Sequence, residues 1–171
     1  MELTRVRVGE DLYNDVLQFL YTEARLLDDD DLGAWLELLA PELKYIMPVR
    51  ETVLAADGQG FSDTAAYYDD DLDSIRLRVS RVQSAAYWAE SPPSRTHRIV
   101  SNVLVDLAGD DLIVTSSLIL LRSRWDLREP DLLSAKRHDT LRRLDGALRI
   151  ARRQVLVDQT NMHTPNLAVL F

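Results

Sequence analysis

The sequence that decides the fold is Leu112-Ile113-Val114-Thr115-Ser116-Ser117-Leu118-Ile119-Leu120-Leu121, which begins a predicted β-strand over residues 112–127. Alternate side chains of a strand point to opposite faces of a sheet. One face carries Leu112, Val114, Ser116, Leu118 and Leu120, and the other carries Ile113, Thr115, Ser117, Ile119, Leu121 and Trp125. Both faces are therefore apolar, whereas an antiparallel sheet with one face in water alternates apolar and polar residues. We expect both faces of this strand to be covered.

The second apolar face needs a cover that the predicted helices cannot supply, because those helices can shelter only the concave side of a curved sheet. Leaving about 500 Å² of such surface in water forgoes on the order of 12 kcal/mol, at about 25 cal/mol per Å². A second subunit is the simplest cover. A loop or the C-terminal tail of the same chain is the alternative.

The neighbouring strands are predicted over residues 95–107, 136–144 and 147–158. Short connections make consecutive strands antiparallel neighbours. Asp145-Gly146 is a strong signal for a two-residue hairpin between the last two strands. The sequence from about 95 to 158 is therefore predicted to form a meander.

The first half of the chain, about 11–90, is predicted to be mainly helical. Apolar residues recur at helical spacing over 11–27, 32–39 and 72–82. The acidic runs 28–31 and 69–71 precede the second and third helices, where carboxylates favour a helix start.

Proline punctuates this first half. Pro41 is predicted to end the second helix, and residues 43–49 then alternate as a short strand. Pro48 indicates an edge strand or a strand end, and residues 55–64 are predicted to form a mobile loop. Helices followed by an antiparallel sheet make one α+β domain over 1–171, with a C-terminal tail, 159–171, whose apolar end is expected to dock.

Composition excludes several classes of protein. The chain has 171 residues and no cysteine, which excludes disulfides, thiol nucleophiles and cysteine-ligated iron–sulfur clusters. The net charge of −8 disfavours nucleic acid and anionic membranes as partners. No apolar run reaches the roughly 20 residues that span a bilayer, and no signal peptide is recognisable, so we expect a cytoplasmic protein.

The residues themselves offer little catalytic chemistry. No phosphate-binding loop, nucleophile elbow or HExxH motif is present. His138 and Asp139 are adjacent, but neighbours on a strand point to opposite faces and cannot pair. His97 lies on an apolar strand face, where a structural role is the simpler interpretation, and Tyr45 either lines a pocket or packs in the core.

Five stretches carry a resemblance to a known family: Phe19–Asp28, Ala34–Leu39, Tyr45–Arg50, Pro92–Val103 and Asn166–Phe171. On these stretches, which follow the family's order along nearly the whole chain, the sequence resembles the small (beta) subunit of the aromatic-ring-hydroxylating Rieske-type dioxygenases.

The resemblance implies an NTF2-like cone, in which N-terminal helices pack inside a long, curved antiparallel or mixed sheet. It also implies a structural subunit of an α3β3 assembly, with self-association into a trimer and with the Rieske [2Fe-2S] cluster and mononuclear iron held by the large (alpha) subunit. A reductase, often with a ferredoxin, would deliver electrons for dihydroxylation of an aromatic ring. The resemblance assigns no catalytic, cofactor-binding or metal-binding residue to this chain.

The candidate subunit-interface residues are Arg95, His97, Arg98, Leu121, Trp125, Leu170 and Phe171. Arg95 and Arg98 form a basic cluster beside an apolar strand of an acidic protein, and the others belong to the apolar strand face or the tail. The alternative function is a stand-alone NTF2-like lyase or isomerase acting on a small hydrophobic ligand in the cone, with Tyr45, His97 and His138 as pocket residues. A third possibility is a ligand-binding module without activity.

Overall fold

The computed structural model describes residues 3–54, 56, 58–84, 92–162, 164 and 166–171. The helices are α1 (Asp11–Asp28), α2 (Leu32–Leu36) and α3 (Leu72–Val82). The strands are β1 (Thr4–Val6), β2 (Leu39–Arg50), β3 (Phe61–Asp70), β4 (Arg95–Ala108), β5 (Asp111–Ser123), β6 (Asp131–Leu144) and β7 (Ala147–Val157).

The strands form one curved sheet in the order β1-β4-β5-β6-β7-β2-β3. All neighbours are antiparallel except β2 and β7, which run parallel, so the sheet is mixed. β4 to β7 are neighbours in chain order, as their short connections predicted. Asp145 and Gly146 both have positive φ, at 50° and 82°, as the predicted hairpin turn requires.

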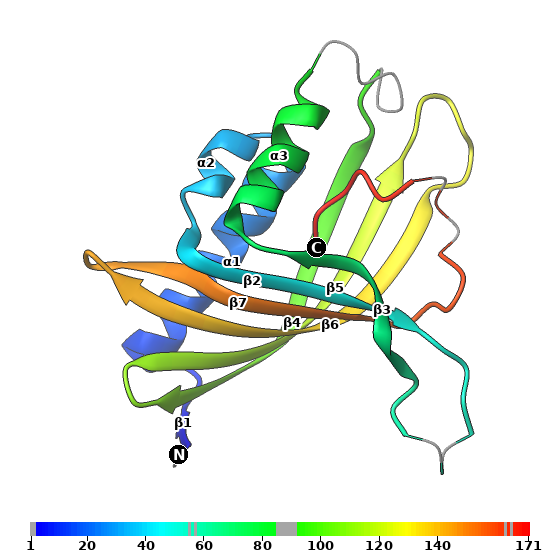
Figure 1. Cartoon of the computed structure of the whole chain (residues 1–171). Coiled ribbons are helices and arrows are strands. Elements are labelled where there is room, and N and C mark those ends of the chain that lie inside the picture. The colour runs from blue at the N-terminus through cyan, green and yellow to red at the C-terminus, as the bar shows by residue number, and fades with distance from the viewer. Residues whose placement is uncertain (1–2, 55, 57, 85–91, 163, 165) are drawn as a thin grey trace.

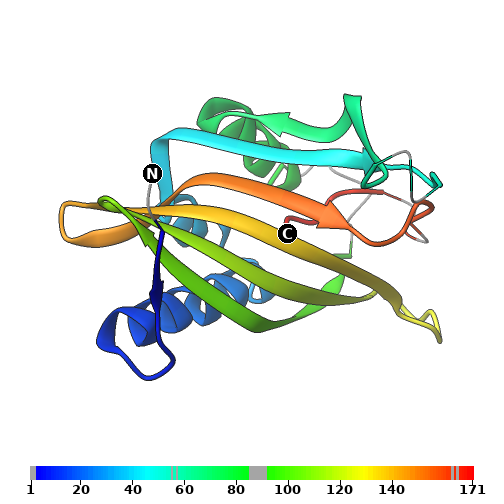
Figure 2. The same cartoon turned by 90° about the horizontal axis from the view of Figure 1, so that it is seen from below.

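All three helices lie on the concave side of the sheet, which wraps partly around them (Figure 1; Figure 2). A bulge in β4 contributes to this curvature, because the register with β5 shifts between Ser101 and Leu104 and Asn102 there has a φ of 52°. The predicted α+β, NTF2-like cone is confirmed.

Helix α1 shows how the sequence fills the cone. Val16, Leu20, Ala24 and Leu27 recur three or four residues apart and are all buried against the sheet. The acidic runs behave as predicted at the other two helices. The Asp31 carboxylate accepts from the Ala34 N–H of α2 at 3.1 Å, and the Asp71 carboxylate accepts from the Ser74 N–H of α3 at 2.9 Å.

The structure differs from prediction mainly in β2 and β3. Helix α2 ends at Leu36, and β2 begins before Pro41 and pairs on both sides, so it is not an edge strand. Pro48 is tolerated because the register with β3 shifts on either side of it. The first half is thus less helical than predicted.

The sequence also did not predict two strands, β1 and β3, and the predicted loop 55–64 extends too far towards its C-terminal end. β1 is a three-residue strand at the sheet edge, and β3 begins inside the predicted loop 55–64. Positions 55 and 57 of that loop lie outside the described residues. The end of the C-terminal tail is buried inside the cone of its own chain (Figure 1).

Candidate functional site

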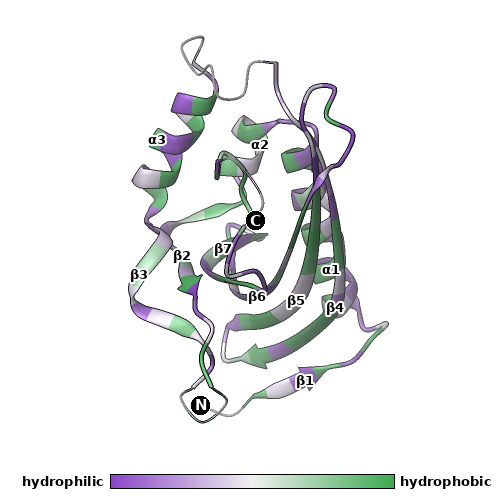
Figure 3. Cartoon of the chain, turned by 90° about the vertical axis from the view of Figure 1, so that its right-hand side faces the viewer, coloured by the Kyte–Doolittle hydropathy of each residue, from purple (hydrophilic) through white to green (hydrophobic). Residues whose placement is uncertain are grey.

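The convex side of the sheet exposes a group of apolar side chains on three adjacent strands, which we call the outer patch. Its members are Ile99, Leu104, Ile119, Leu121 and Leu132. Ile99 pairs in register with Ile119, and Leu121 with Leu132. Ile99, Ile119 and Leu132 are 45%, 42% and 55% exposed, so the described chain leaves this surface largely uncovered. Figure 3 shows the long hydrophobic stretches of β4 and β5 that contribute to it.

Four of the candidate interface residues lie at or beside the outer patch. Leu121 belongs to it, and exposed His97 pairs in register with Leu121. Exposed Arg95 begins β4 and donates to the Trp125 carbonyl oxygen at 3.0 Å. Trp125, just beyond β5, is 45% exposed and donates its indole N–H to the Pro92 carbonyl oxygen. These four residues are available to a partner.

The other three interface candidates point into the cone. Arg98 is buried and donates to the Asp28 carboxylate at 2.5 Å and to the Leu170 carbonyl oxygen at 2.8 Å. Leu170 and Phe171 are also buried within their own chain. Arg95 and Arg98 are close in the sequence and were predicted to form one basic cluster. They lie three positions apart on one strand, however, so their side chains face opposite sides of the sheet.

Neither His97 nor His138 lies in the cone. His97 and His138 are both exposed, and His138 lies on the convex side, where it lines an open groove of about 770 Å³ beneath the β2–β3 loop. Asp139, the next residue, is buried on the concave side, as expected for neighbours on a strand. Of the three pocket candidates only Tyr45 lies inside the cone, so the acid–base pair proposed for the alternative lyase is not assembled there.

The centre of the cone holds a buried cluster of two acids and two bases that we call the core ion cluster: Glu23, Asp139, Arg137 and Arg153. Arg153 donates to both oxygens of the Glu23 carboxylate and, through Nε and Nη2, to Asp139 at 2.8 Å each. Arg137 donates to Glu23 at 3.2 Å. Two positive and two negative charges balance, which is what allows charged groups to remain in a dry interior.

The surroundings fix the protonation of this cluster. Burial alone would raise the pKa of Glu23, but the charges of Arg153 and Arg137 and the hydrogen bonds from Arg153 and Trp35 outweigh it and lower the pKa to about 2. Burial raises the pKa of Tyr45 to about 12, so its hydroxyl stays protonated. Both groups hold one state around neutral pH. A general acid or base needs a pKa near the working pH, so this cluster is suited to a structural role.

The core ion cluster was not predicted, although the sequence contains a signal for it. Glu23 falls on the buried face of α1, between Leu20 and Ala24. A lone acid on an apolar helix face requires a buried cation, and Arg137 and Arg153 fall on the inward-facing positions of their strands. What the sequence alone does not give is which arginine meets which acid.

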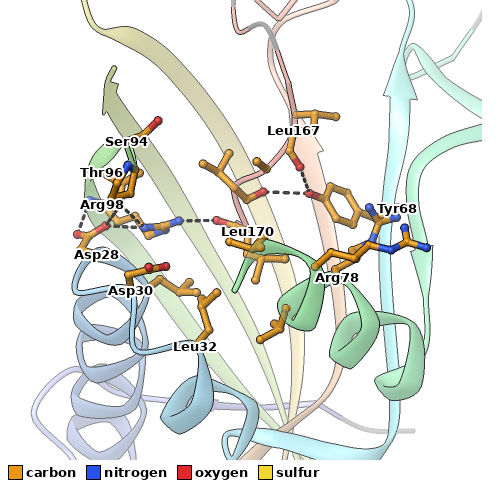
Figure 4. Close-up of a pocket in the computed structure, with 17 residues that line it drawn as sticks. Asp28, Asp30, Leu32, Tyr68, Arg78, Ser94, Thr96, Arg98, Leu167 and Leu170 are labelled. Atoms are coloured by element: carbon orange, nitrogen blue, oxygen red, sulfur yellow. Dashed lines mark hydrogen bonds and ion pairs between the residues drawn. The ribbon is translucent and has the colours of Figure 1, made fainter. Parts of the chain in front are cut away.

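A cavity of about 240 Å³ lies at the mouth of the cone, between α3, the start of β4 and the tail (Figure 4). Its walls are mainly apolar, with the Arg98–Asp28 ion pair on one side and Tyr68 and Arg78 on the other. Arg78 is occupied by an ion pair with Asp70 at 2.6 Å. Arg98, Asp28 and Arg78 at this mouth are thus engaged by other groups of the same chain.

Neither a metal centre nor a membrane-spanning helix is found among the residues that the structure describes. No three histidine, aspartate or glutamate side chains there come together in a way that could hold a metal ion. No helix in the same part of the chain is long and apolar enough to cross a membrane.

Comparison with known proteins gives the family. Benzene 1,2-dioxygenase subunit beta of Pseudomonas putida is 34% identical over 171 residues, covering 96% of this chain and 91% of that protein. N,N-dimethyl phenylurea N-demethylase subunit beta of a Sphingobium species is also 34% identical, over 154 residues that cover 89% of this chain and 87% of that protein. A chain of a naphthalene 1,2-dioxygenase, solved with indole in the active site, superposes with a TM-score of 0.82 at 26% identity, covering 92% of this chain and 84% of that chain.

The family description agrees with these relatives and with the geometry of the chain. Residues 22–164 match the family described as the ring hydroxylating beta subunit. That match spans the last turns of α1, all of α2 and α3, the strands that carry the outer patch, and the core ion cluster. The chain therefore belongs to the family of beta subunits of ring-hydroxylating dioxygenases.

Proposed function

We propose that this chain is a structural, non-catalytic subunit that holds iron-bearing large subunits in an α3β3 assembly, and that the outer patch is a surface on which it associates. The observation that carries the proposal is the apolar convex face of β4, β5 and β6, which the described chain leaves exposed. Monomeric proteins rarely leave such contiguous apolar area in water. The charge-balanced interior supports the same assignment, because the pKa shifts of Glu23 and Tyr45 leave each of these two groups in one protonation state around neutral pH.

The assembled enzyme would dihydroxylate an aromatic ring, in the breakdown of an aromatic compound. Its relatives include subunits named for benzene, chlorobenzene and biphenyl dioxygenases. The beta subunit of a demethylase has the same 34% identity to this chain as the benzene dioxygenase subunit. Similar beta subunits thus occur in enzymes that catalyse different reactions, which supports the proposal that the large subunit determines the reaction. The Rieske cluster and the mononuclear iron would be in that subunit, and a reductase, often with a ferredoxin, would supply electrons to it.

The beta chains would also contact each other, as a trimer that forms the base of the assembly, in the cytoplasm. Exposed Arg95, His97 and Trp125 lie around the outer patch and would contribute polar contacts at the rim of such an interface.

The alternative, a stand-alone lyase or isomerase, has less support. Its two histidines face away from the cone, and the segment that ends at Phe171 occupies the interior. Tyr45, the remaining pocket candidate, is engaged with Phe171 through its hydroxyl group.

Co-expression with the cognate large subunit tests the proposal. We expect the two chains to co-purify, with a native mass of three copies of each, with iron in the complex and with oxygen-dependent turnover of an aromatic compound. The isolated chain should show no turnover. A large subunit that assembles and turns over fully without this chain would overturn the scaffold function.

A further inference from the structure

The end of the chain is held in an unusual way. Residues 166–171, which we call the strap, form no helix or strand, yet Val169, Leu170 and Phe171 are buried. Buried main-chain groups need hydrogen-bond partners, which strands normally obtain from neighbouring main chain. In the strap, the main-chain oxygens of five residues obtain them from side chains instead.

The donors come from five different strands. Arg122 of β5 donates to the Asn166 oxygen at 3.0 Å, and Arg98 of β4 donates to the Leu170 oxygen at 2.8 Å. Tyr68 of β3 lies 2.9 Å from the Leu167 oxygen and 3.0 Å from the Val169 oxygen (Figure 4).

Phe171, the innermost residue of the strap, has three hydrogen bonds between its main chain and side chains of the cone. Arg153 of β7 donates to the Phe171 oxygen at 2.9 Å, and the Tyr45 hydroxyl of β2 donates to the same oxygen at 2.7 Å. The Phe171 N–H in turn donates to the Tyr45 oxygen at 3.0 Å. The Phe171 side chain is completely buried.

These donors are also held in place by groups outside the strap. Arg98 is fixed by Asp28, and Arg153 is fixed by Glu23 and Asp139. The ring of Tyr68 packs on Tyr45, with centroids 5.6 Å apart, and lies under the Arg78 guanidinium. A site whose donors are already positioned binds its ligand at a lower entropic cost.

The selectivity of the site follows from which atoms it contacts. It recognises the main-chain oxygens of an extended segment and encloses three apolar side chains at the inner end. Leu167, Ala168, Val169 and Leu170 also border the 240 Å³ cavity, so a larger side chain in place of the small Ala168 has room there.

We propose that the inside of the cone is a binding site for an extended apolar peptide, that the strap is its resident ligand, and that the same segment supplied as a separate peptide can replace it. This proposal is independent of the dioxygenase assembly. It adds to the common modes of peptide recognition one in which buried arginine and tyrosine side chains take the place of a strand edge.

A cleavable form of the full chain tests the exchange. A protease site is inserted between Thr160 and Asn161, both exposed, so that the protein folds with the strap attached and is cut afterwards. An isotope-labelled peptide of residues 161–171, with the same C-terminal group as the cut fragment, is then added and the complex is weighed by native mass spectrometry. We expect the cut fragment to stay bound and to be replaced by the labelled peptide as its concentration rises. Loss of the fragment with no uptake of labelled peptide, or retention with no exchange, would overturn the proposal.

Peptide variants separate recognition by the cone from general hydrophobic adhesion. The Ala168→Leu peptide should bind within about threefold of the native peptide. The Phe171→Ala peptide should bind at least a hundredfold more weakly, since it leaves a buried space empty. Methylation of the Phe171 main-chain nitrogen should weaken binding at least tenfold, because it removes the hydrogen bond that the Phe171 N–H donates to the Tyr45 oxygen. A scrambled peptide that binds as well as the native one would refute recognition.

A change in the protein gives the complementary test. Tyr68→Phe removes the hydroxyl that donates to the strap and keeps the ring, so the cut protein should bind the labelled peptide about tenfold more weakly. Tyr21→Phe, at an exposed position of α1, is the matched control and should leave binding unchanged. Equal affinity in the two variants would contradict the assigned role of the Tyr68 hydroxyl.

Discussion

Glu23 of α1 and Arg153 of β7 form a two-point ion pair at the centre of the cone, although 130 residues separate them in the sequence. Neither side chain is exposed. The pair joins the first helix to the last strand, and Asp139 and Phe171 complete the coordination of the same guanidinium. The space that would hold a ligand in an open cone is here filled by interactions within the chain.

We predict that Glu23→Gln lowers the free energy of unfolding at pH 7 by about 3 kcal/mol or more. The substitution leaves Arg153 and Arg137 buried without their shared carboxylate, which is far more costly than losing an exposed ion pair. Urea unfolding followed by tryptophan fluorescence measures the change. Glu42→Gln is the control, because Glu42 pairs with Arg142 at the surface and should change stability by less than about 1 kcal/mol. Similar losses in the two variants would contradict the structural role of the core ion cluster.

The lowered pKa of Glu23 predicts an acid-sensitive stability. Folding depresses this pKa from an unfolded value of about 4.3 to about 2, so its stabilising contribution is complete above about pH 5. The contribution is lost as the pH falls from there towards 2, where the folded form also takes up the proton. The stability difference between the native chain and Glu23→Gln should therefore shrink across this range. Unfolding midpoints at pH 7, 5, 3.5 and 2.5 measure it, and a constant difference would be inconsistent with the lowered pKa.

Arg98 and Arg95 are predicted to behave differently despite their proximity in the sequence. Arg98→Ala removes the partner of the Asp28 carboxylate and of the Leu170 oxygen, so it should destabilise the isolated chain by about 3 kcal/mol. Arg95→Ala, at an exposed position, should cost less than about 1 kcal/mol. Thermal unfolding of both variants distinguishes them, and equal melting temperatures would show that Arg98 does not have the internal role assigned to it.

His97 and His138 are predicted to be dispensable for turnover by the assembled enzyme. His97→Ala/His138→Ala should keep the turnover of the assembled enzyme within about twofold, when the rate is expressed per iron, because neither imidazole reaches the cone or a metal site in the described structure. Turnover of an aromatic substrate by the reconstituted complex measures this. Loss of activity at normal assembly and iron content would revive the lyase-type interpretation.

Much of the fold follows from local patterns in the sequence. The helical spacing of α1 and α3, the Asp145-Gly146 turn and the alternation along β5 each depend on neighbouring residues, and each was predictable. The two apolar faces of β5 also predicted where the exposed outer patch lies. β2 was predicted less well, because its length and its place between β7 and β3 depend on pairing with β7, more than 100 residues away, and not on its own prolines.

The interface candidates show the same limit for side chains. The sequence grouped Arg95, Arg98 and the last two residues by composition and position, and only the three-dimensional register separates the outward-facing from the inward-facing ones. Likewise, the partners of Glu23 on β6 and β7 depend on long-range packing that no local motif encodes.

The most direct test of the scaffold function places one charge on the outer patch. Ile119→Asp is co-expressed with the large subunit and the assembled fraction is measured by native mass spectrometry. Leu77→Asp is the control, because Leu77 is an apolar residue of α3 that is 52% exposed, against 42% for Ile119. We expect Ile119→Asp to lower the assembled fraction at least tenfold while the chain keeps its fold by circular dichroism, and Leu77→Asp to assemble normally. A complex of normal mass and yield from Ile119→Asp would show that the convex face of the sheet is not where this subunit associates.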